Sequence, residues 1–232
     1  MDPKSDVPSD EGTVLLVRKP AGWTSFDVVN KIRHLFGIRK VGHAGTLDPL
    51  ATGLLIVCTG RKTKEIGSLV GLEKEYEAEM TLGARTASFD AATPVLETRS
   101  TEGITEDAVR SVLLEFVGTQ HQVPPMWSAL KVGGRRLYKY AREGTEVSRT
   151  AREVSIRSIV PTEMHLPRVR FTVVCSKGTY VRSLVNDMGE RLGCLAYLSA
   201  LERTRIGQFH LADALTIEEL ATAPCTLSPG AT

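Results

Sequence analysis

The chain has 232 residues, of which 42% are hydrophobic, and a formal net charge of +2. This length and composition allow a sizeable core without metals or disulfides, so we expect one large domain, or a domain with a small lobe. The four cysteines form no CxxC pair and have no histidines at ligand spacing, which argues against a zinc site or a disulfide framework. Reduced thiols and a cytoplasmic location are therefore expected. No apolar stretch is long enough to span a membrane.

The first twelve residues have their own composition. Residues 1–12 carry four acids, one lysine and two prolines and contain no apolar run. This pattern excludes a secretory signal and predicts a disordered leader. We expect the folded domain at residues 13–222 and a short tail at residues 223–232.

A strand, a turn and a helix are the first elements predicted. The apolar run at residues 14–17 ends at Lys19-Pro20 and is typical of a strand, because proline cannot donate to a ladder. Thr24 or Ser25 then caps a helix that ends at Gly37. One face of this helix is apolar and consists of Val28, Ile32, Leu35 and Phe36.

A glycine-rich loop at residues 42–53 leads into a buried strand at residues 54–58. Within it, Asp48 precedes Pro49, and turn initiation alone would explain such a pair. A loop that continues into a core strand is nevertheless held firmly, which suits a catalytic position.

The middle of the chain predicts a strand, a loop and a helix. Residues 75–82 alternate, with Tyr76, Ala78, Met80 and Leu82 on the apolar face. A polar loop around Asp90 is expected at Gly83–Arg99. Thr105 then caps a helix that buries Val109, Val112, Leu113 and Phe116 and stops at Gly118.

Two further strands are expected at residues 154–160 and 169–175, followed by a helix from residue 181 to Gly193. A last strand at residues 196–201 and a capping-box helix at residues 216–219 complete the chain. The predicted fold class is α+β, with a mixed, largely antiparallel sheet flanked by helices.

A basic segment follows the middle helix. Residues 131–152 contain seven bases and two acids, giving 7 − 2 = +5, and aromatic residues Trp127, Tyr138 and Tyr140 lie within or beside it. The pattern is that of a phosphate-facing patch, although a solvated basic surface is an equally good explanation. With Gly133-Gly134 as a turn, it reads as an insertion at about residues 124–152. The bases are Lys131, Arg135, Arg136, Lys139, Arg142, Arg149 and Arg152.

Arg182 lies in the first turn of its predicted helix, where the helix dipole disfavours a cation by up to about 1 kcal/mol. A buried aspartate or an RNA phosphate would offset this cost, and a surface arginine could also tolerate it. Together, Asp48, Arg182, and Tyr76 or Tyr180 supply a carboxylate, a cation and an aromatic hydroxyl. The carboxylate can act as a nucleophile or a base, the arginine can hold it ionised, and the aromatic hydroxyl can stack on a base or move a proton.

The segment at residues 42–53, GHAGTLDPLATG, resembles the catalytic motif of the TruB family, the bacterial tRNA pseudouridine-55 synthases. Four more blocks resemble the family in consistent order, at residues 19–25, 75–76, 125–131 and 175–182. The resemblance runs from about Gly12 to Leu220 and implies the pseudouridine synthase fold. It is far more specific than any single motif.

The resemblance implies a role for each matching residue. Asp48 would be the nucleophile, Arg182 its salt-bridge partner, and Tyr76 the ring that packs against the flipped base, while His43 would help to extrude the uridine. Residues that would line or support the pocket or contact the RNA are Lys19, Lys64, Asp90, Tyr180 and Leu201. Residues that would grip RNA from the insertion are Lys131, Arg135 and Arg136.

The implied activity is the isomerisation of uridine 55 in the T-arm of tRNA. This reaction needs no cofactor or metal, no guide RNA and no protein partner, and a monomer is the default expectation. Two alternatives remain open. One is a uridine isomerase that acts on another RNA, and the other is an RNA-binding folding chaperone in which Asp48 has no role.

The chain departs from the family pattern in three places. Arg18 stands where the family usually has an aspartate, and residues 91–94 after Asp90 read AATP where Asp-Gly is common. The chain also ends soon after Leu220, so no full C-terminal PUA domain is expected.

Overall fold

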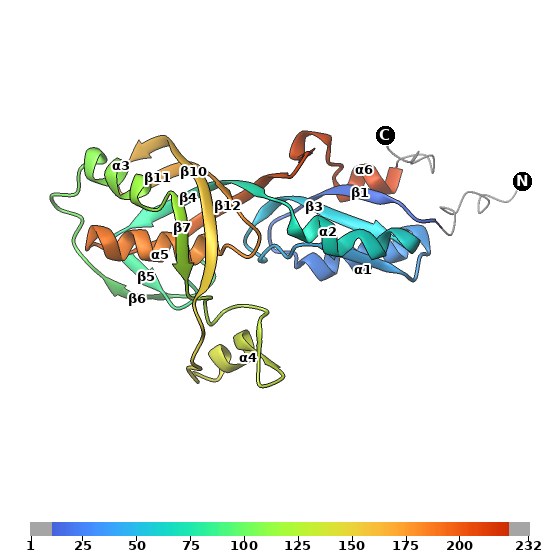
Figure 1. Cartoon of the computed structure of the whole chain (residues 1–232), viewed down its shortest axis with the longest axis horizontal. Helices are drawn as coiled ribbons and strands as arrows, with labels where there is room; N and C mark the ends of the chain where they lie inside the picture. Colours follow the sequence, from blue (N-terminus) through green and yellow to red (C-terminus); the bar gives the residue numbers. More distant parts are fainter. Residues whose placement is uncertain (1–10, 223–232) are drawn as a thin grey trace, which may run out of the picture. The chain divides into compact units, whose positions relative to one another are not determined.

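The computed structural model describes residues 11–222, which form two compact units (Figure 1). The terminal unit consists of the residues up to 75 together with those from 202 onward, and the central unit consists of residues 76–201. The predicted tail at 223–232 and all but the last two residues of the predicted leader lie outside the described residues.

The terminal unit is built around β3 (Thr52–Thr59), whose residues 53–59 are all buried. β1 (Val14–Lys19) and β2 (Val41–Ala44) both pair with β3 in antiparallel orientation. β12 (Ala196–Ile206) pairs with it in parallel through residues 202 and 203. The predicted buried strand at 54–58 is therefore confirmed, and three other strands fix its position.

α1 (Ser25–Phe36) begins and ends where the sequence predicts. Thr24, and not Ser25, is the N-cap, and it forms a capping box with Asp27. Gly37 ends the helix at φ +65°, a left-handed conformation that glycine adopts without strain. The helix packs its buried face against β1 and β3 in a core that includes Val17, Val28, Val29, Ile32, Leu55 and Val57.

The prediction of a continuous loop at residues 42–53 is wrong at its beginning. Residues 41–44 form β2, in which Gly42 lies opposite Cys58 and His43 lies opposite Val57 of β3. The short sequence has no strand pattern of its own, and its conformation comes from pairing with the buried strand. The loop that carries Asp48 is therefore shorter, at residues 45–51.

The terminal unit also contains several short elements. Thr216 and Glu219 form the predicted capping box, in which each main-chain N–H donates to the side chain of the other residue. The remaining elements of this unit are η1 (Gly60–Glu65), α2 (Ile66–Gly71), β13 (Phe209–His210), η2 (Leu211–Asp213) and α6 (Ile217–Thr222).

The strands of the central unit follow the order β12, β4, β11, β10, β7. The bounds of these strands are β4 (Lys74–Leu82), β7 (Gly118–Gln122), β10 (Arg152–His165) and β11 (Arg168–Cys175). β10 pairs antiparallel with both β11 and β7. The apolar face predicted for β4 is confirmed, because Tyr76, Ala78, Met80 and Leu82 are all buried.

Two longer helices belong to the central unit. α5 (Val181–Leu192) spans its predicted residues and ends at Gly193, which has φ +77°. α3 (Glu106–Glu115) is capped by Thr105 as predicted, but it ends before the predicted stop at Gly118. Phe116 and Val117 form i to i−3 bonds that tighten the last turn, and Gly118 is already the first residue of β7.

The prediction of a polar loop at residues 83–99 is wrong. β5 (Ala84–Thr86) and β6 (Val95–Thr98) form a two-stranded antiparallel hairpin, in which Arg85 lies opposite Glu97. Strands this short show no recognisable alternation, and isolated two-stranded hairpins are marginally stable. The hairpin therefore depends on contacts with other elements.

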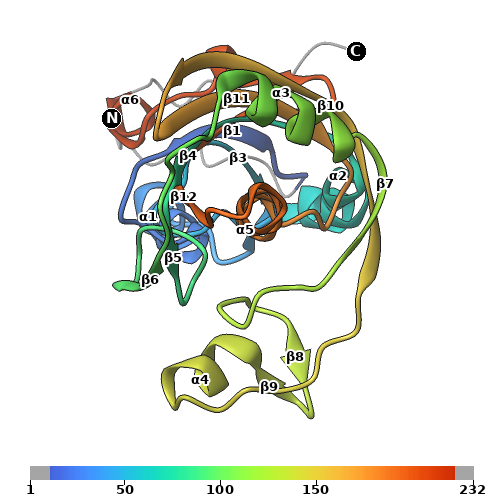
Figure 2. The same ribbon diagram turned by 90° about the vertical axis from the view of Figure 1, so that its left-hand side faces the viewer.

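The insertion forms its own small lobe, which Figure 2 shows extending away from the strands of the central unit. It contains β8 (Lys131–Val132), β9 (Arg135–Arg136) and α4 (Leu137–Arg142). Gly133 and Gly134 both have positive φ, at +57° and +79°, as a tight hairpin turn requires. The predicted turn is confirmed.

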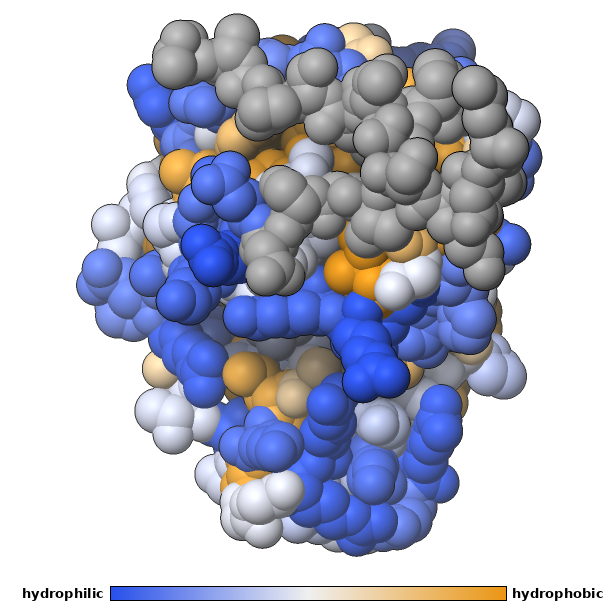
Figure 3. All heavy atoms as spheres, turned by 90° about the vertical axis from the view of Figure 1, so that its right-hand side faces the viewer, coloured by the Kyte–Doolittle hydropathy of each residue, from blue (hydrophilic) through white to orange (hydrophobic). Residues whose placement is uncertain are grey.

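The predicted fold class is confirmed, because helices flank a mixed and mostly antiparallel set of strands. On the face seen in Figure 3, hydrophilic residues predominate and hydrophobic residues gather in smaller areas. Within residues 11–222, every helix is too short or too polar to cross a membrane.

Candidate functional site

The loop that carries Asp48 is fixed at several points of its backbone. Gly22 N donates to Pro49 O at 2.8 Å, and Ala51 N donates to Asp48 O at 3.1 Å. Leu47 N donates to the buried hydroxyl of Ser25 at 2.9 Å. The loop is thus held against the first turn of α1, as expected for a catalytic position.

Lys19 is fully buried, with 0% of its surface exposed. Its Nζ donates to Pro20 O at 2.9 Å, Trp23 O at 2.6 Å and Pro49 O at 3.4 Å. Burial lowers the pKa of Lys19 to about 8, although the nearby Asp48 carboxylate raises it. The expected contact between Lys19 and RNA is not supported, because this side chain holds the backbone on both sides of the site instead.

His43 lies on β2, one residue before the end of the strand and five residues before Asp48. Burial, followed by repulsion from the Arg203 guanidinium, lowers the pKa of His43. Its imidazole is therefore neutral at neutral pH. Arg203 was not among the residues predicted for the site, although it is buried beside His43 and also lowers the pKa of Lys19.

In the central unit, Arg182 is 3% exposed and is held by residues of two other segments. Its Nη1 donates to Ser88 O and its Nη2 to Trp127 O, each at 2.9 Å, and its Nε lies 3.5 Å from Asp90 Oδ2. The anionic partner expected for a cation in the first helical turn is therefore present as a buried aspartate. The expected pairing of Arg182 with Asp48 stays a prediction.

The loop around Asp90 is rigid. Asp90 Oδ1 accepts hydrogen bonds from Ser88 Oγ and from Ala92 N. Phe89 has φ +62°, which is uncommon for an aromatic residue, and its carbonyl accepts a bond from Leu198 N at 3.0 Å. Backbone strain of this kind persists only where the surroundings enforce it. Asp90 thus supports Arg182, and its role towards a substrate pocket stays a prediction.

Tyr180 is the N-cap of α5, and its backbone is held by a residue that the sequence did not suggest. The side chain of Gln122 accepts from Tyr180 N at 2.7 Å and donates to Tyr180 O at 3.0 Å. Tyr76 is buried on β4, and Leu201 is half-buried on β12. The roles of Tyr76, Tyr180 and Leu201 towards a substrate stay predictions.

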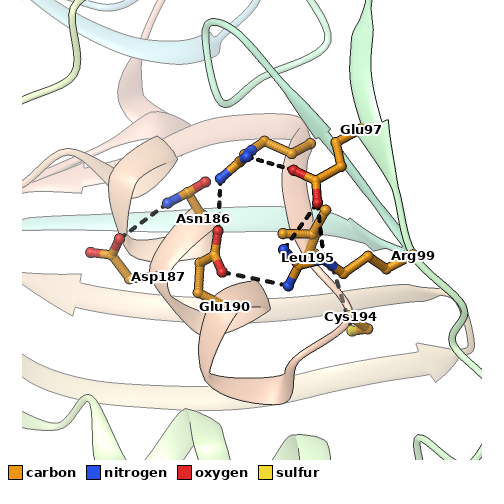
Figure 4. Close-up of polar contacts among 8 residues, drawn as sticks. Glu97, Arg99, Asn186, Asp187, Glu190, Cys194 and Leu195 are labelled. Carbon is orange, nitrogen blue, oxygen red and sulfur yellow. Dashed lines mark hydrogen bonds and ion pairs between the residues drawn. The ribbon is translucent and has the colours of Figure 1, made fainter.

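A ring of four charged residues fastens the β5–β6 hairpin to the end of α5 (Figure 4). Arg85 pairs with Glu97 at 2.6 Å and with Glu190 at 2.8 Å, and Arg99 pairs with the same two glutamates at 2.9 and 3.8 Å. α5 therefore binds this hairpin twice, through Arg182 near its beginning and through Glu190 near its end.

The insertion presents cations to solvent. Lys131, Arg136, Lys139 and Arg142 are exposed, whereas Arg135 is half-buried. Arg135 lies 4.7 Å from the ring centre of Tyr140 and pairs with Glu143, which neutralises part of its charge. At the base of the insertion, Arg149 Nη1 donates to Pro124 O at 3.2 Å and so joins the two ends.

A second cationic cluster, which the sequence did not suggest, lies in the terminal unit. Gly60 N donates to Lys40 O at 2.9 Å, which brings η1 beside the segment before β2. Arg61 and Lys64 are three residues apart on η1 and share one face of this 3-10 helix. Among the described residues, no carboxylate forms an ion pair with the exposed cations Arg39, Lys40, Arg61 and Lys64. We call this set the η1 cluster.

Within residues 11–222, no group of histidine, cysteine, aspartate and glutamate side chains could hold a metal ion. Cys58, Cys175 and Cys194 are buried thiols, and burial raises the pKa of Cys58 to about 11. The fourth cysteine, Cys225, lies outside the described residues.

Comparison with known families gives matches over most of the chain. Residues 33–181 match the N-terminal domain of the TruB family pseudouridylate synthases. Residues 182–228 match the C-terminal domain described for tRNA pseudouridylate synthase B, a description that does not name a PUA domain.

Proteins named tRNA pseudouridine synthase B are similar to the chain. Those of Chloroherpeton thalassium and Phocaeicola vulgatus are 46% and 48% identical to it, over 90% of this chain in each case and over 89% and 91% of the relative. The protein of Burkholderia pseudomallei is 49% identical over 90% of this chain and 69% of its own length.

Two solved structures are also similar. A Cbf5-Nop10-Gar1 complex contains a chain with a TM-score of 0.73 and 30% identity, over 95% of this chain and 56% of that chain. An H/ACA RNP bound to a substrate RNA containing 2′-deoxyuridine gives a TM-score of 0.68 and 29% identity, over 91% of this chain and 53% of that chain. The chain thus spans about half the length of the chains that it matches in these two structures.

Proposed function

Because the chain belongs to the TruB family of pseudouridylate synthases, which are isomerases, we propose that it converts uridine 55 in the T-arm of tRNA to pseudouridine. The observation that carries this proposal is the position of Asp48 in a firmly held loop beside the buried ammonium of Lys19. A nearby cation stabilises the ionised form of a carboxylate. The names of the relatives described above support tRNA as the substrate.

The proposed chemistry needs a nucleophile and a base but no redox partner. Asp48 attacks the flipped uridine at the sugar or at the base, and the bond between N1 and C1′ breaks. After rotation of the uracil a bond forms between C5 and C1′, and the bond to Asp48 breaks and releases the carboxylate. C5 loses its proton and N1 gains one, so the atoms balance. Tyr76 packs against the base and assists proton removal from C5. Arg182 holds the reacting groups in place, and no cofactor or metal is required.

Base flipping costs a few kcal/mol, which contacts elsewhere must offset. We assign the extrusion of the uridine to His43, whose lowered pKa keeps the imidazole neutral and able both to donate and to accept a hydrogen bond. The buried Lys19 holds the backbone beside the loop of Asp48, and the buried Asp90 holds Arg182. Tyr180 and Leu201 line the pocket.

Phosphate contacts come from two exposed cationic surfaces. One is the insertion at residues 124–152, with Lys131, Arg135 and Arg136, and the other is the η1 cluster, which includes Lys64. Exposed cations that neutralise phosphates release the counterions condensed on a nucleic acid.

The proposed function also concerns the domain organisation, location and oligomeric state of the chain. Residues 13–222 act as one catalytic domain with the RNA-gripping insertion, in the cytoplasm, as a monomer and without guide RNA or a protein partner.

A tritium-release assay on tRNA labelled at uracil C5 tests this function. The native chain releases tritium, because C5 loses its hydrogen when the new bond forms, and Asp48→Asn abolishes release while tRNA binding is retained. Asp213→Asn is the matched control, because Asp213 is an exposed aspartate of the same unit, and it retains full activity. Release that survives Asp48→Asn contradicts the assignment of the nucleophile.

The same assay separates the two alternatives. A transcript altered only in the T-arm loses release under the proposed function but retains it if another uridine is the target. A folding chaperone would show no release from any transcript, and Asp48→Asn would refold misfolded tRNA as well as the native chain does.

A further inference from the structure

We propose that Arg203 is a positioning residue that ties the beginning of the loop that carries Asp48 to β3, the strand that follows this loop. This inference rests on the proposed function, because it assigns the loop its catalytic task. Arg203 Nη2 donates to Gly45 O at 3.0 Å and Arg203 Nε donates to Leu54 O at 2.8 Å. Gly45 precedes Asp48 by three residues and Leu54 follows it by six.

The planar guanidinium fixes the distance between these two carbonyl oxygens. Its donors lie in one rigid fork, so bonds to Gly45 O, at the beginning of the loop, and to Leu54 O, in β3, define how far apart these two points are. Arg203 is 1% exposed and is among the largest fully buried side chains of the described residues. Lys19 differs, because its bonds to Pro20 and Trp23 anchor it mainly to the segment after β1.

The backbone on both sides of the loop is adapted to Arg203. Gly53 pairs with Arg203 in the parallel register of β3 and β12 and has φ +101°. A Cβ atom at Gly53 would lie 2.4 Å from Arg203 O, so no other residue can occupy this position without a shift. A Cβ atom at Gly45, which has φ +89°, would lie 3.6 Å from Arg203 Nη1. Gly53 therefore allows the close approach of the Arg203 backbone, whereas at Gly45 the contact would be an ordinary one and the positive φ alone favours glycine.

Arg203 also contributes charge to the site. Among the described residues, no carboxylate lies within ion-pair distance of it, and its recorded bonds go to main-chain carbonyl groups. Arg203 and Lys19 are thus two buried cations close to the loop of Asp48, and a nearby cation favours the ionised form of a carboxylate.

Two substitutions separate geometry from charge. Arg203→Lys keeps the charge but loses the planar pair of donors, and Arg203→Gln loses both. We expect both variants to fold and to bind tRNA within about threefold of the native affinity. Single-turnover pseudouridine formation falls about a hundredfold in each, because a misplacement of about 1 Å at a reacting group has an effect of this size.

Arg205→Gln is the matched control. Arg205 lies on the same strand and also donates to a main-chain carbonyl, that of Gly207, but it has no contact with the loop. Its variant keeps the native single-turnover rate within about threefold. A merely destabilising effect on β12 would slow all three variants alike.

The imidazole of His43 provides a readout that does not depend on activity. NMR titration of His43 should give a higher pKa in Arg203→Gln, because the repulsive charge is absent, and an almost native pKa in Arg203→Lys. Native turnover in both folded variants would overturn the positioning role. Failure of both to fold would overturn it as well and leave Arg203 a residue of stability alone. Absence of turnover in the native chain contradicts instead the proposed function.

Discussion

The two units keep buried cations in different ways. In the terminal unit, Lys19 and Arg203 are bound by main-chain carbonyl oxygens. In the central unit, Arg182 is bound by two carbonyl oxygens and also by the carboxylate of Asp90. Carbonyl groups satisfy donors without cancelling charge, whereas a carboxylate cancels it. The first arrangement leaves a positive field around Asp48, and the second supplies a rigid but locally neutral support.

The largest effect should come from breaking the ion pair of the central unit. Arg182→Met leaves Asp90 buried without its cation and should lower the free energy of unfolding by about 3–5 kcal/mol. Urea denaturation measures this change. The double variant Arg182→Met/Asp90→Asn should lose less free energy of unfolding than the two single variants together, because neither charge is then buried without its partner.

The exposed Arg110 on α3 provides the control for this comparison. Its partner Glu106 is also exposed, so Arg110→Met should change stability by at most about 0.5 kcal/mol. A loss below about 1 kcal/mol for Arg182→Met would mean that Asp90 does not depend on this cation.

A smaller effect, visible only at high pH, should come from Lys19. Its pKa in the folded protein is about 8, below the ordinary 10.5. The unfolded chain therefore binds more protons between these two values, and stability from this group rises with pH across the window. The difference in unfolding free energy between the native chain and Lys19→Met should grow, by about 3 kcal/mol at most, from pH 8 to pH 10.5. A difference that is constant with pH would show that Lys19 titrates normally.

The smallest effect should come from the charged ring on α5. Glu190→Gln removes the pairs with Arg85 and Arg99, whose side chains are 34% and 42% exposed, so solvent screens them. We expect a loss of about 0.5–1 kcal/mol at low salt. In 1 M NaCl, where the Debye length is about 3 Å, the loss should nearly vanish. Glu102→Gln, at an exposed and unpaired glutamate, should have no effect at either salt concentration, and a salt-independent loss for Glu190→Gln would point to packing instead.

Periodicity and capping residues predicted the regular elements well. α1, α5 and β4 have apolar residues at the spacing of their structure, and Thr24, Thr105 and Gly193 mark the ends of helices. The β5–β6 hairpin and β2 were missed because their strands have at most four residues. Pairing partners determine their conformation, and a local pattern does not contain that information.

The sequence could not predict which buried residues hold the site residues in place. Arg203 reads as one charge in the polar run ERTR, and its burial follows from the pairing of β12 with β3, about 150 residues earlier in the chain. The burial of Lys19 likewise could not be inferred from its position at the end of a strand pattern. The need of Arg182 for an anion was predicted from the helix dipole, whereas the choice of Asp90 required the hairpin.

The geometry of α5 fixes the spacing between the two residues that contact the β5–β6 hairpin. Arg182, Asn186 and Glu190 follow one another at intervals of four residues and lie on one side of the helix, so the two anchors of the hairpin are about 12 Å apart along the axis. One added or deleted residue between them would turn Glu190 by about 100° away from Arg85 and Arg99 while Arg182 stayed in place. The number of residues between Arg182 and Glu190 therefore matters to the site as much as the identity of these two residues.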